Sequence, residues 1–204
     1  MTVHYPNGKK FVPTKTPNDS KPNRKIDFGN RGKTLEDELN ETNEFYLSRN
    51  LAVIHKKPVP IQVVKVDYPS RSSAVIREAY YRTASTTDYN GVWMGRYIDF
   101  EAKETKNKTS FPLQNIHSHQ MEHMENIVAN QGIAFLLVRF STLNRYFLLP
   151  YQVLKSCWED MNKGARKSIS LNIFEDKGFE LIPKAFPRID YLEALEKMVH
   201  QIQS

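Results

Sequence analysis

A nearly unbroken apolar run, Ile133–Phe140, constrains the fold of this chain more than any other segment. A strand of this composition is covered on both faces, as the central strands of α/β sheets are. Periodicity predicts helices at about 34–48, 113–131, 151–161 and 191–203, and further strands at 51–55, 85–93, 96–103 and 144–149. The alternation of the two kinds of element predicts a mixed α/β fold.

The segment Tyr97–Lys103 carries the clearest sign of chemistry. Because a strand turns successive side chains to opposite faces, Glu101 and Lys103 lie side by side on one face, together with Asp99. Asp88 precedes Asn90-Gly91, which predicts a turn that folds Asp88 back beside them. Two carboxylates and a lysine suit a hard cation, a phosphate and an attacking water. The same alternation is also typical of a solvated strand face.

The composition narrows the class of protein. The chain has 204 residues, 29 Lys+Arg against 23 Asp+Glu and a net charge of +6, which favours a polyanionic partner. Its single cysteine, Cys157, excludes an intramolecular disulfide and fits a reducing compartment. No stretch approaches the roughly 20 apolar residues that span a bilayer. We therefore expect a cytoplasmic protein that does not enter the membrane.

Positive charge is concentrated in two segments. Residues 1–29 are basic, rich in proline and poor in large apolar residues, which predicts a disordered arm. Residues 49–82 carry seven Lys/Arg and two acids. Within them, 58–82 has two extended stretches, the first bracketed by Pro58 and Pro69, and we interpret 58–82 as an insertion that projects from the domain. The remainder of 30–204 is expected to form a single domain.

Asp88, then Glu101-Ala102-Lys103 on the next strand, then a helix that carries Gln120, resembles the PD-(D/E)xK nuclease superfamily. Thr87 replaces the proline of that motif. The match extends further, to the RecU family of Holliday junction resolvases of low-GC Gram-positive bacteria. It is carried by five blocks in order: Asn30-Arg31-Gly32-Lys33-Thr34-Leu35-Glu36, Ile54-His55-Lys56-Lys57-Pro58, Thr86-Thr87-Asp88-Tyr89-Asn90-Gly91, Arg96 to Thr105, and Phe111-Pro112-Leu113-Gln114-Asn115.

This resemblance implies a restriction-endonuclease-like mixed sheet flanked by helices, a protruding stalk between the protomers of a homodimer, and cleavage of four-way DNA junctions in recombination and repair. Recombinase and branch-migration proteins are further candidate partners. Carried over by position, Thr86, Asp88, Glu101 and Gln120 are expected to hold Mg²⁺, for which Mn²⁺ substitutes. Lys103 is expected to stabilise the transition state.

Several residues keep two interpretations. Glu36 is either an additional site acid or a carboxylate that stabilises the start of its helix. Asp99 is expected to form a structural pair with a neighbouring base. His119 and His123 lie one helical turn apart, but no cysteine or acid at matching spacing completes a zinc site. Candidates for DNA contact are basic or aromatic: Arg31, Lys56, Arg71, Arg77, Tyr80, Arg82 and Arg96.

The leading hypothesis is a structure-selective endonuclease that resolves junctions by paired symmetric nicks. Two alternatives remain open. A sequence-specific restriction-type nuclease shares the site but reads base edges. A DNA-binding or strand-annealing protein that modulates a recombinase needs the basic segments and not the acids.

Overall fold

The computed structural model of the chain describes residues 33–67, 74–81 and 86–203. The helices are α1 (Leu35–Ser48), α2 (Ser118–Ala129), α3 (Tyr151–Asn162), α4 (Leu171–Lys177) and α5 (Tyr191–Gln203), with a 3₁₀ helix η1 (Leu113–Asn115). The strands are β1 (Val53–Lys56), β2 (Ile61–Asp67), β3 (Val75–Tyr81), β4 (Tyr89–Trp93), β5 (Arg96–Thr105), β6 (Ser110–Pro112), β7 (Ile133–Phe140), β8 (Arg145–Pro150), β9 (Ser168–Ser170) and β10 (Phe179–Leu181). Within these residues, no helix is long and apolar enough to cross a membrane. The predicted arm, 1–29, lies outside them.

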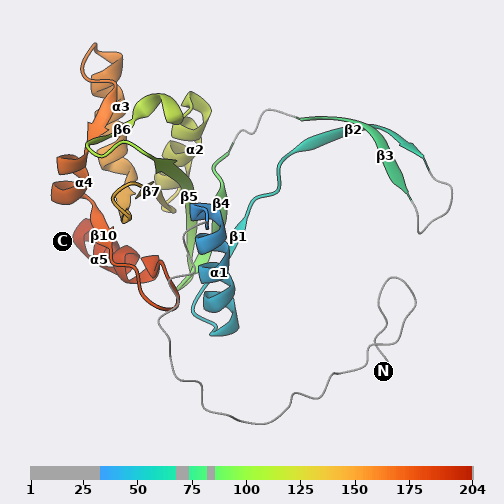
Figure 1. Ribbon diagram of the computed structural model, residues 1–204, viewed down its shortest axis with the longest axis horizontal. Coiled ribbons are helices and arrows are strands. Elements are labelled where there is room, and N and C mark those ends of the chain that lie inside the picture. The colour runs from blue at the N-terminus through green and yellow to red at the C-terminus, as the bar shows by residue number, and fades with distance from the viewer. Residues whose placement is uncertain (1–32, 68–73, 82–85, 204) are drawn as a thin grey trace, which may run out of the picture. The chain divides into compact units, whose positions relative to one another are not determined.

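Six strands form one mixed sheet in the order β1-β4-β5-β7-β8-β10. β5 and β7 are parallel, and the other neighbours are antiparallel. A parallel pair needs a long crossover, which here contains α2. Seven of the eight residues of β7 are buried, as expected of a central strand. The predicted α/β class, a mixed sheet flanked by helices, is confirmed (Figure 1).

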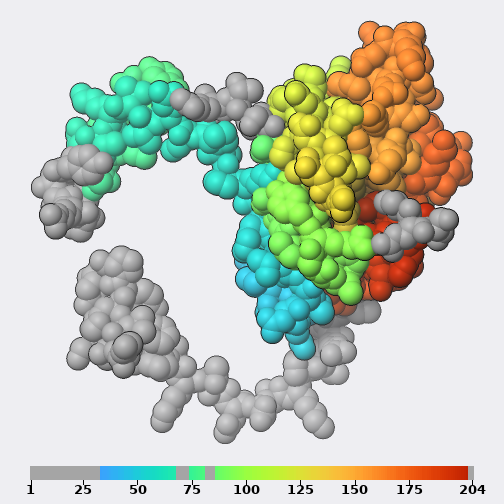
Figure 2. Space-filling model, turned by 180° about the vertical axis from the view of Figure 1, so that it is seen from behind, coloured from blue at the N-terminus to red at the C-terminus, as the bar shows by residue number. Residues whose placement is uncertain are grey.

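The sheet has an apolar core on each face. Phe100 and Phe135 point to the core that α1 and α5 cover, whereas Leu136 and Val138 point to the core beneath α2 and α3. Figure 1 shows the two pairs of helices on opposite sides of the sheet. In the space-filling view, cyan atoms of α1 and β1 lie beside green atoms of β4 and β5 and yellow atoms of α2 (Figure 2). These elements are the ones that carry the predicted site.

Most of the predicted elements are present. The helix at 34–48 begins as expected, with Thr34 as N-cap in a capping box with Asp37. The predicted helix at 113–131 was too long, because Ile116 is extended and separates η1 from α2, which begins after His117. The sequence analysis also missed β6, β9, α4 and β10, which are short elements of three to seven residues.

The predicted turn at Asn90-Gly91 is wrong. Both residues lie inside β4, and the turn to β5 is formed by Met94 and Gly95, with φ of 49° and 74°. Positive φ at both central residues is what a tight two-residue hairpin turn requires. Gly91 is needed for a different reason, because a Cβ at this position would lie 2.0 Å from the carbonyl oxygen of Val53 in β1.

Strands β2 and β3 form a separate two-stranded sheet. They pair antiparallel, with register shifts around Lys65. Their side chains are largely exposed, including Ile61, Val64 and Ile76. The hairpin falls within 58–82, the segment that we interpret as an insertion. Its assignment as a stalk stays a prediction, as does the single domain at 30–204.

Candidate active site

Asp88 and Glu101 come together through the pairing of β4 with β5. The register sets Tyr89 against Phe100, so Asp88, one residue before β4, lies next to Glu101 on the face that α2 covers. Oδ2 of Asp88 accepts a hydrogen bond of 3.4 Å from the backbone N–H of Ala102. The sequence therefore predicted the right neighbours with the wrong turn, since the antiparallel register and not a reversal at Asn90-Gly91 brings them together.

Glu101 is fully buried, and among the described residues no donor other than the Lys103 ammonium reaches its carboxylate. Its charge is opposed only by Lys103, whose Nζ lies 2.5 Å from Oε1. Burial, followed by the nearby charge of Asp88, raises the pKa of Glu101 to about 7, although Lys103 acts in the opposite direction. A buried carboxylate with a single cationic partner, beside a second carboxylate, fits a divalent cation as a further partner.

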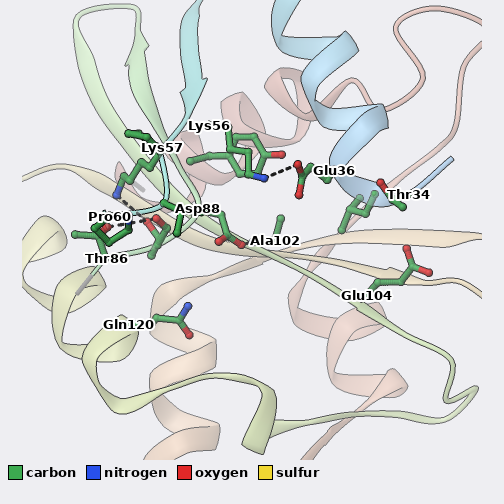
Figure 3. A pocket seen from close by; sticks show the side chains of 15 residues that line it. Thr34, Glu36, Lys56, Lys57, Pro60, Thr86, Asp88, Ala102, Glu104 and Gln120 are labelled. Carbon is green, nitrogen blue, oxygen red and sulfur yellow. Dashed lines mark hydrogen bonds and ion pairs between the residues drawn. The ribbon is translucent and has the colours of Figure 1, made fainter. Parts of the chain in front are cut away.

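A cavity of about 530 Å³ lies beside these residues. Asp88 lines it, and so do Ala102 and Glu104 of β5, which alternate with Glu101 and point to the opposite face of the strand. Glu101 and Lys103 are not among the lining residues. Figure 3 shows α1, β1, β5 and α2 contributing side chains to the cavity, among them Glu36, Lys56, Lys57, Thr86 and Gln120. The lining residues thus come from five segments of the chain: 34–36, 56–60, 86–89, 102–104 and the start of α2 at Gln120.

Gln120 and Thr86 both line this cavity, as their predicted roles require. Gln120 is buried on α2, and its Oε1 accepts a hydrogen bond of 2.9 Å from the backbone N–H of His117 at the start of that helix. The amide oxygen therefore already accepts a hydrogen bond, and the amide nitrogen is the atom of this side chain that can contact another group. A direct bond from Oε1 to a cation requires the side chain to turn away from His117. The Thr86 hydroxyl makes only a long contact, 3.5 Å, to the carbonyl oxygen of Thr87.

Glu36 lies in the first turn of α1 and forms an ion pair with Lys56, and both residues line the cavity (Figure 3). Its position fits both interpretations, because a carboxylate there stabilises the N-terminus of α1 and also adds negative charge to the cavity. The pairing brings Lys56, a predicted DNA contact, close to the site.

The other predicted DNA contacts that the structure describes do not line the cavity. Arg77 pairs with Asp67 across the β2–β3 hairpin at 2.6 Å, and the hydroxyl of Tyr80 donates to Glu78. Arg96 is exposed at the start of β5. Arg31, Arg71 and Arg82 lie outside the described residues.

Sequence reasoning missed the group of side chains around Asp99. This carboxylate pairs with Lys57 at 2.7 Å, and not with Lys103 or Arg96. Thr87 and His123 also contact it. The block Ile54 to Pro58 marked Lys57 as part of the family pattern, but nothing local in the sequence shows that Lys57 and Asp99, 42 residues apart, are in contact.

The model of the family described as Recombination protein U matches residues 30–197. A protein from Bacillus cytotoxicus named Holliday junction resolvase RecU is 54% identical over 196 residues, which are 96% of this chain and 98% of the relative. One of the same name from Lactiplantibacillus plantarum is 52% identical and covers 100% of this chain and 99% of its own length.

Among solved structures, that of Archaeoglobus fulgidus Hjc, described as a Holliday junction resolvase, has a TM-score of 0.41 and 10% identity, and covers 70% of this chain and 94% of its own. The family match and the two sequence relatives span nearly the whole chain. The chain therefore belongs to the RecU family.

Proposed function

We propose that this protein is a divalent-metal-dependent endonuclease that cuts four-way DNA junctions. The names of the two relatives support this substrate, because each matches nearly the whole chain. The observation that carries the chemistry is Glu101, a fully buried carboxylate beside Asp88, whose one donor among the described residues is the ammonium of Lys103. A structural ion pair alone does not explain why two carboxylates share this site.

Asp88 and Glu101 are the residues that hold the cation in this proposal, with Thr86 and Gln120 as outer partners. Bound Mg²⁺, or Mn²⁺ in its place, would supply positive charge that stabilises the negative charge of the phosphate, and it would lower the pKa of the attacking water. Lys103 carries a positive charge two residues from Glu101 on the same face of β5, where it neutralises negative charge that develops on the phosphate. Lys56 and Arg96 are proposed phosphate contacts.

The proposed partner is junction DNA, bound by a homodimer. A four-way junction has approximate two-fold symmetry, so an isologous dimer places one active site on each of two opposing strands. Paired symmetric nicks then follow from geometry. We also propose that the protein acts in the cytoplasm of a bacterium, where chromosomal DNA is repaired.

The test is cleavage of a synthetic four-way junction and of a linear duplex of the same sequence, with and without Mg²⁺. The variants are Asp88→Asn and Glu101→Gln, which keep side-chain size. Glu38→Gln is the matched control, because Glu38 is also a fully buried carboxylate in an ion pair, with Arg188, and lies outside the cavity lining.

Paired nicks in the junction by the wild type and by Glu38→Gln, absent without Mg²⁺ and absent in the other two variants, support the proposal. Cleavage of the plain duplex at fixed sequences would support the restriction-type alternative. Junction binding without cleavage by the wild type would instead favour a DNA-binding or annealing protein.

A further inference from the structure

The segment that carries Asp88 has no regular secondary structure at Thr86–Asp88, yet Lys57 holds it at two points. The backbone N–H of Lys57 donates a hydrogen bond of 2.7 Å to the carbonyl oxygen of Asp88. The ammonium of the same residue donates one of 3.0 Å to the Thr87 hydroxyl. Figure 3 shows Lys57 extending from the end of β1 toward this segment. One residue therefore binds both the backbone and the side chain of the Thr87-Asp88 pair.

Asp99 in turn holds both partners of this contact. Its Oδ2 lies 2.7 Å from Nζ of Lys57, and its Oδ1 accepts a hydrogen bond from the Thr87 hydroxyl. The Tyr97 hydroxyl donates to Oδ2 at 3.0 Å, and Nε2 of His123 lies 3.2 Å from the same oxygen. Asp99 is fully buried. Both of its oxygens have partners, whereas Oε2 of Glu101 has none among the described residues, so Asp99 is unlike a carboxylate that awaits a cation.

The position of Asp99 on β5 links the strand that carries Glu101 to the segment that carries Asp88. Asp99 and Glu101 are two residues apart in one strand and therefore point to the same face. The strand that carries Glu101 thus also anchors the segment that carries Asp88. Thr87, where the superfamily motif has proline, supplies the hydroxyl for this anchor, which proline lacks.

We propose that Asp99, acting through Lys57 and Thr87, is a positioning residue that fixes Asp88 relative to Glu101 for cation binding. The inference rests on the proposed function, because it assigns Asp88 and Glu101 to the cation. Partners that orient metal ligands typically contribute about 10- to 100-fold to metal affinity or activity. A similar loss is expected here when the anchor is removed.

Two substitutions break the anchor in different ways. Asp99→Asn keeps the size of the side chain but removes the negative charge that balances the Lys57 ammonium. Thr87→Val keeps the shape of the side chain and removes only the hydroxyl, so that the charge around the cation is unchanged. Glu38→Gln is again the control, since it removes a fully buried, ion-paired carboxylate away from the cavity.

The experiment measures Mn²⁺ binding to each protein without DNA, from the electron paramagnetic resonance signal of free Mn²⁺, and in parallel the Mg²⁺ concentration for half-maximal junction cleavage. We expect Asp99→Asn and Thr87→Val each to raise the Mn²⁺ dissociation constant about tenfold or more. The Mn²⁺ dissociation constant of the double variant should not exceed the larger of the two single-variant values, because both substitutions act through one anchor. Glu38→Gln should bind as the wild type does.

Unchanged Mn²⁺ affinity in Thr87→Val would overturn the proposal, even if Asp99→Asn is weakened, because the loss would then come from the charge alone. Thr87→Val also decides the matter if Asp99→Asn does not fold. A wild type that cuts no junction would refute the proposed function, while the Mn²⁺ comparison would still decide on the anchor. A wild type that binds no Mn²⁺ would overturn both the anchor and the cation site.

Discussion

The ammonium nitrogen of Lys103 lies 2.5 Å from Oε1 of Glu101, so two side chains on the same face of β5 form an ion pair. Glu101 is fully buried, whereas 26% of the Lys103 side chain is exposed. Lys103 is thus positioned to stabilise the charged form of Glu101 and also to reach a ligand. An ion pair with Glu101 and a catalytic role of Lys103 at the phosphate are therefore compatible with the same side-chain position.

Lys103→Gln should reduce junction cleavage by about 100- to 1,000-fold, because removing one charge-stabilising group from an active site typically costs this much. It should also raise the pKa of Glu101 further, since Lys103 is the group that lowers it. Cleavage rates at saturating Mg²⁺ check the first effect, and the Mg²⁺ concentration for half-maximal cleavage, measured from pH 6 to pH 9, checks the second.

Lys155→Gln is the matched control for Lys103, because Lys155 is also ion-paired, with Glu125, but on the exposed face of α3. It should cut at the wild-type rate. A Lys103→Gln enzyme with wild-type activity would reduce Lys103 to a structural partner of Glu101.

The raised pKa of Glu101 predicts how stability depends on pH. The pKa is about 7 in the folded, metal-free protein against 4.5 for an unperturbed glutamate. The folded state therefore binds more protons between these values, and its free energy of unfolding falls as pH rises through about 7. A difference of this size corresponds to up to about 3 kcal/mol. Urea unfolding of the metal-free protein at pH 5 and pH 8 measures it.

Glu101→Gln should remove most of this pH dependence and be more stable than the wild type at pH 8 without metal. Added Mg²⁺ should stabilise the wild type more at pH 8 than at pH 6, because only the ionised carboxylate binds the cation. Equal pH dependence in the two proteins would mean that Glu101 is not the group responsible.

The sequence predicted the central elements of the site because local patterns encode them. Alternation at Tyr97–Lys103 placed Glu101 and Lys103 on one face, and the apolar run predicted the central strand β7, which pairs with β5. The turn was misplaced because Asn90-Gly91 is a strong hairpin signal, whereas this glycine is required by the close approach of β1.

Contacts between segments that are distant in the sequence could not be predicted from local sequence patterns. Lys57 meets Asp99 only after β1 pairs with β4 and β4 with β5. The orientation of the Gln120 amide likewise depends on where α2 begins, which the apolar periodicity placed several residues too early. Periodicity identifies which residues share a face, but not which partner from another element occupies it.

Gly91→Ala should strongly destabilise the fold. A Cβ there would lie 2.0 Å from the carbonyl oxygen of Val53 and 2.6 Å from Cα of Ile54, both backbone atoms of β1. Because backbone atoms cannot move aside without breaking the pairing of β1 with β4, we expect a loss of about 3 kcal/mol or more. Urea unfolding checks it.

Gly95→Ala is the comparison, since a Cβ at Gly95 meets nothing within 4 Å and only the positive φ of 74° is unfavourable. It should cost about 1 kcal/mol. A Gly91→Ala protein as stable as Gly95→Ala would show that β1 lies further from β4 than described.

Replacing residues 61–81 with a short Gly-Ser linker should leave the six-stranded sheet folded. β2 and β3 pair only with each other among the described residues, and most of their side chains are exposed. Little apolar surface is therefore lost from the two cores of the sheet, and the unfolding midpoint in urea should change little.

If the hairpin selects the shape of the junction, the shortened protein should bind junction and linear duplex with equal affinity while it retains metal-dependent nicking. The anchor supplied by Lys57 lies before the deleted segment and Thr87 after it, so the linker must let both reach Asp99. Mn²⁺ binding as in the wild type verifies that the site is intact. If the shortened protein still prefers the junction, residues outside the β2–β3 hairpin must select the shape of the junction.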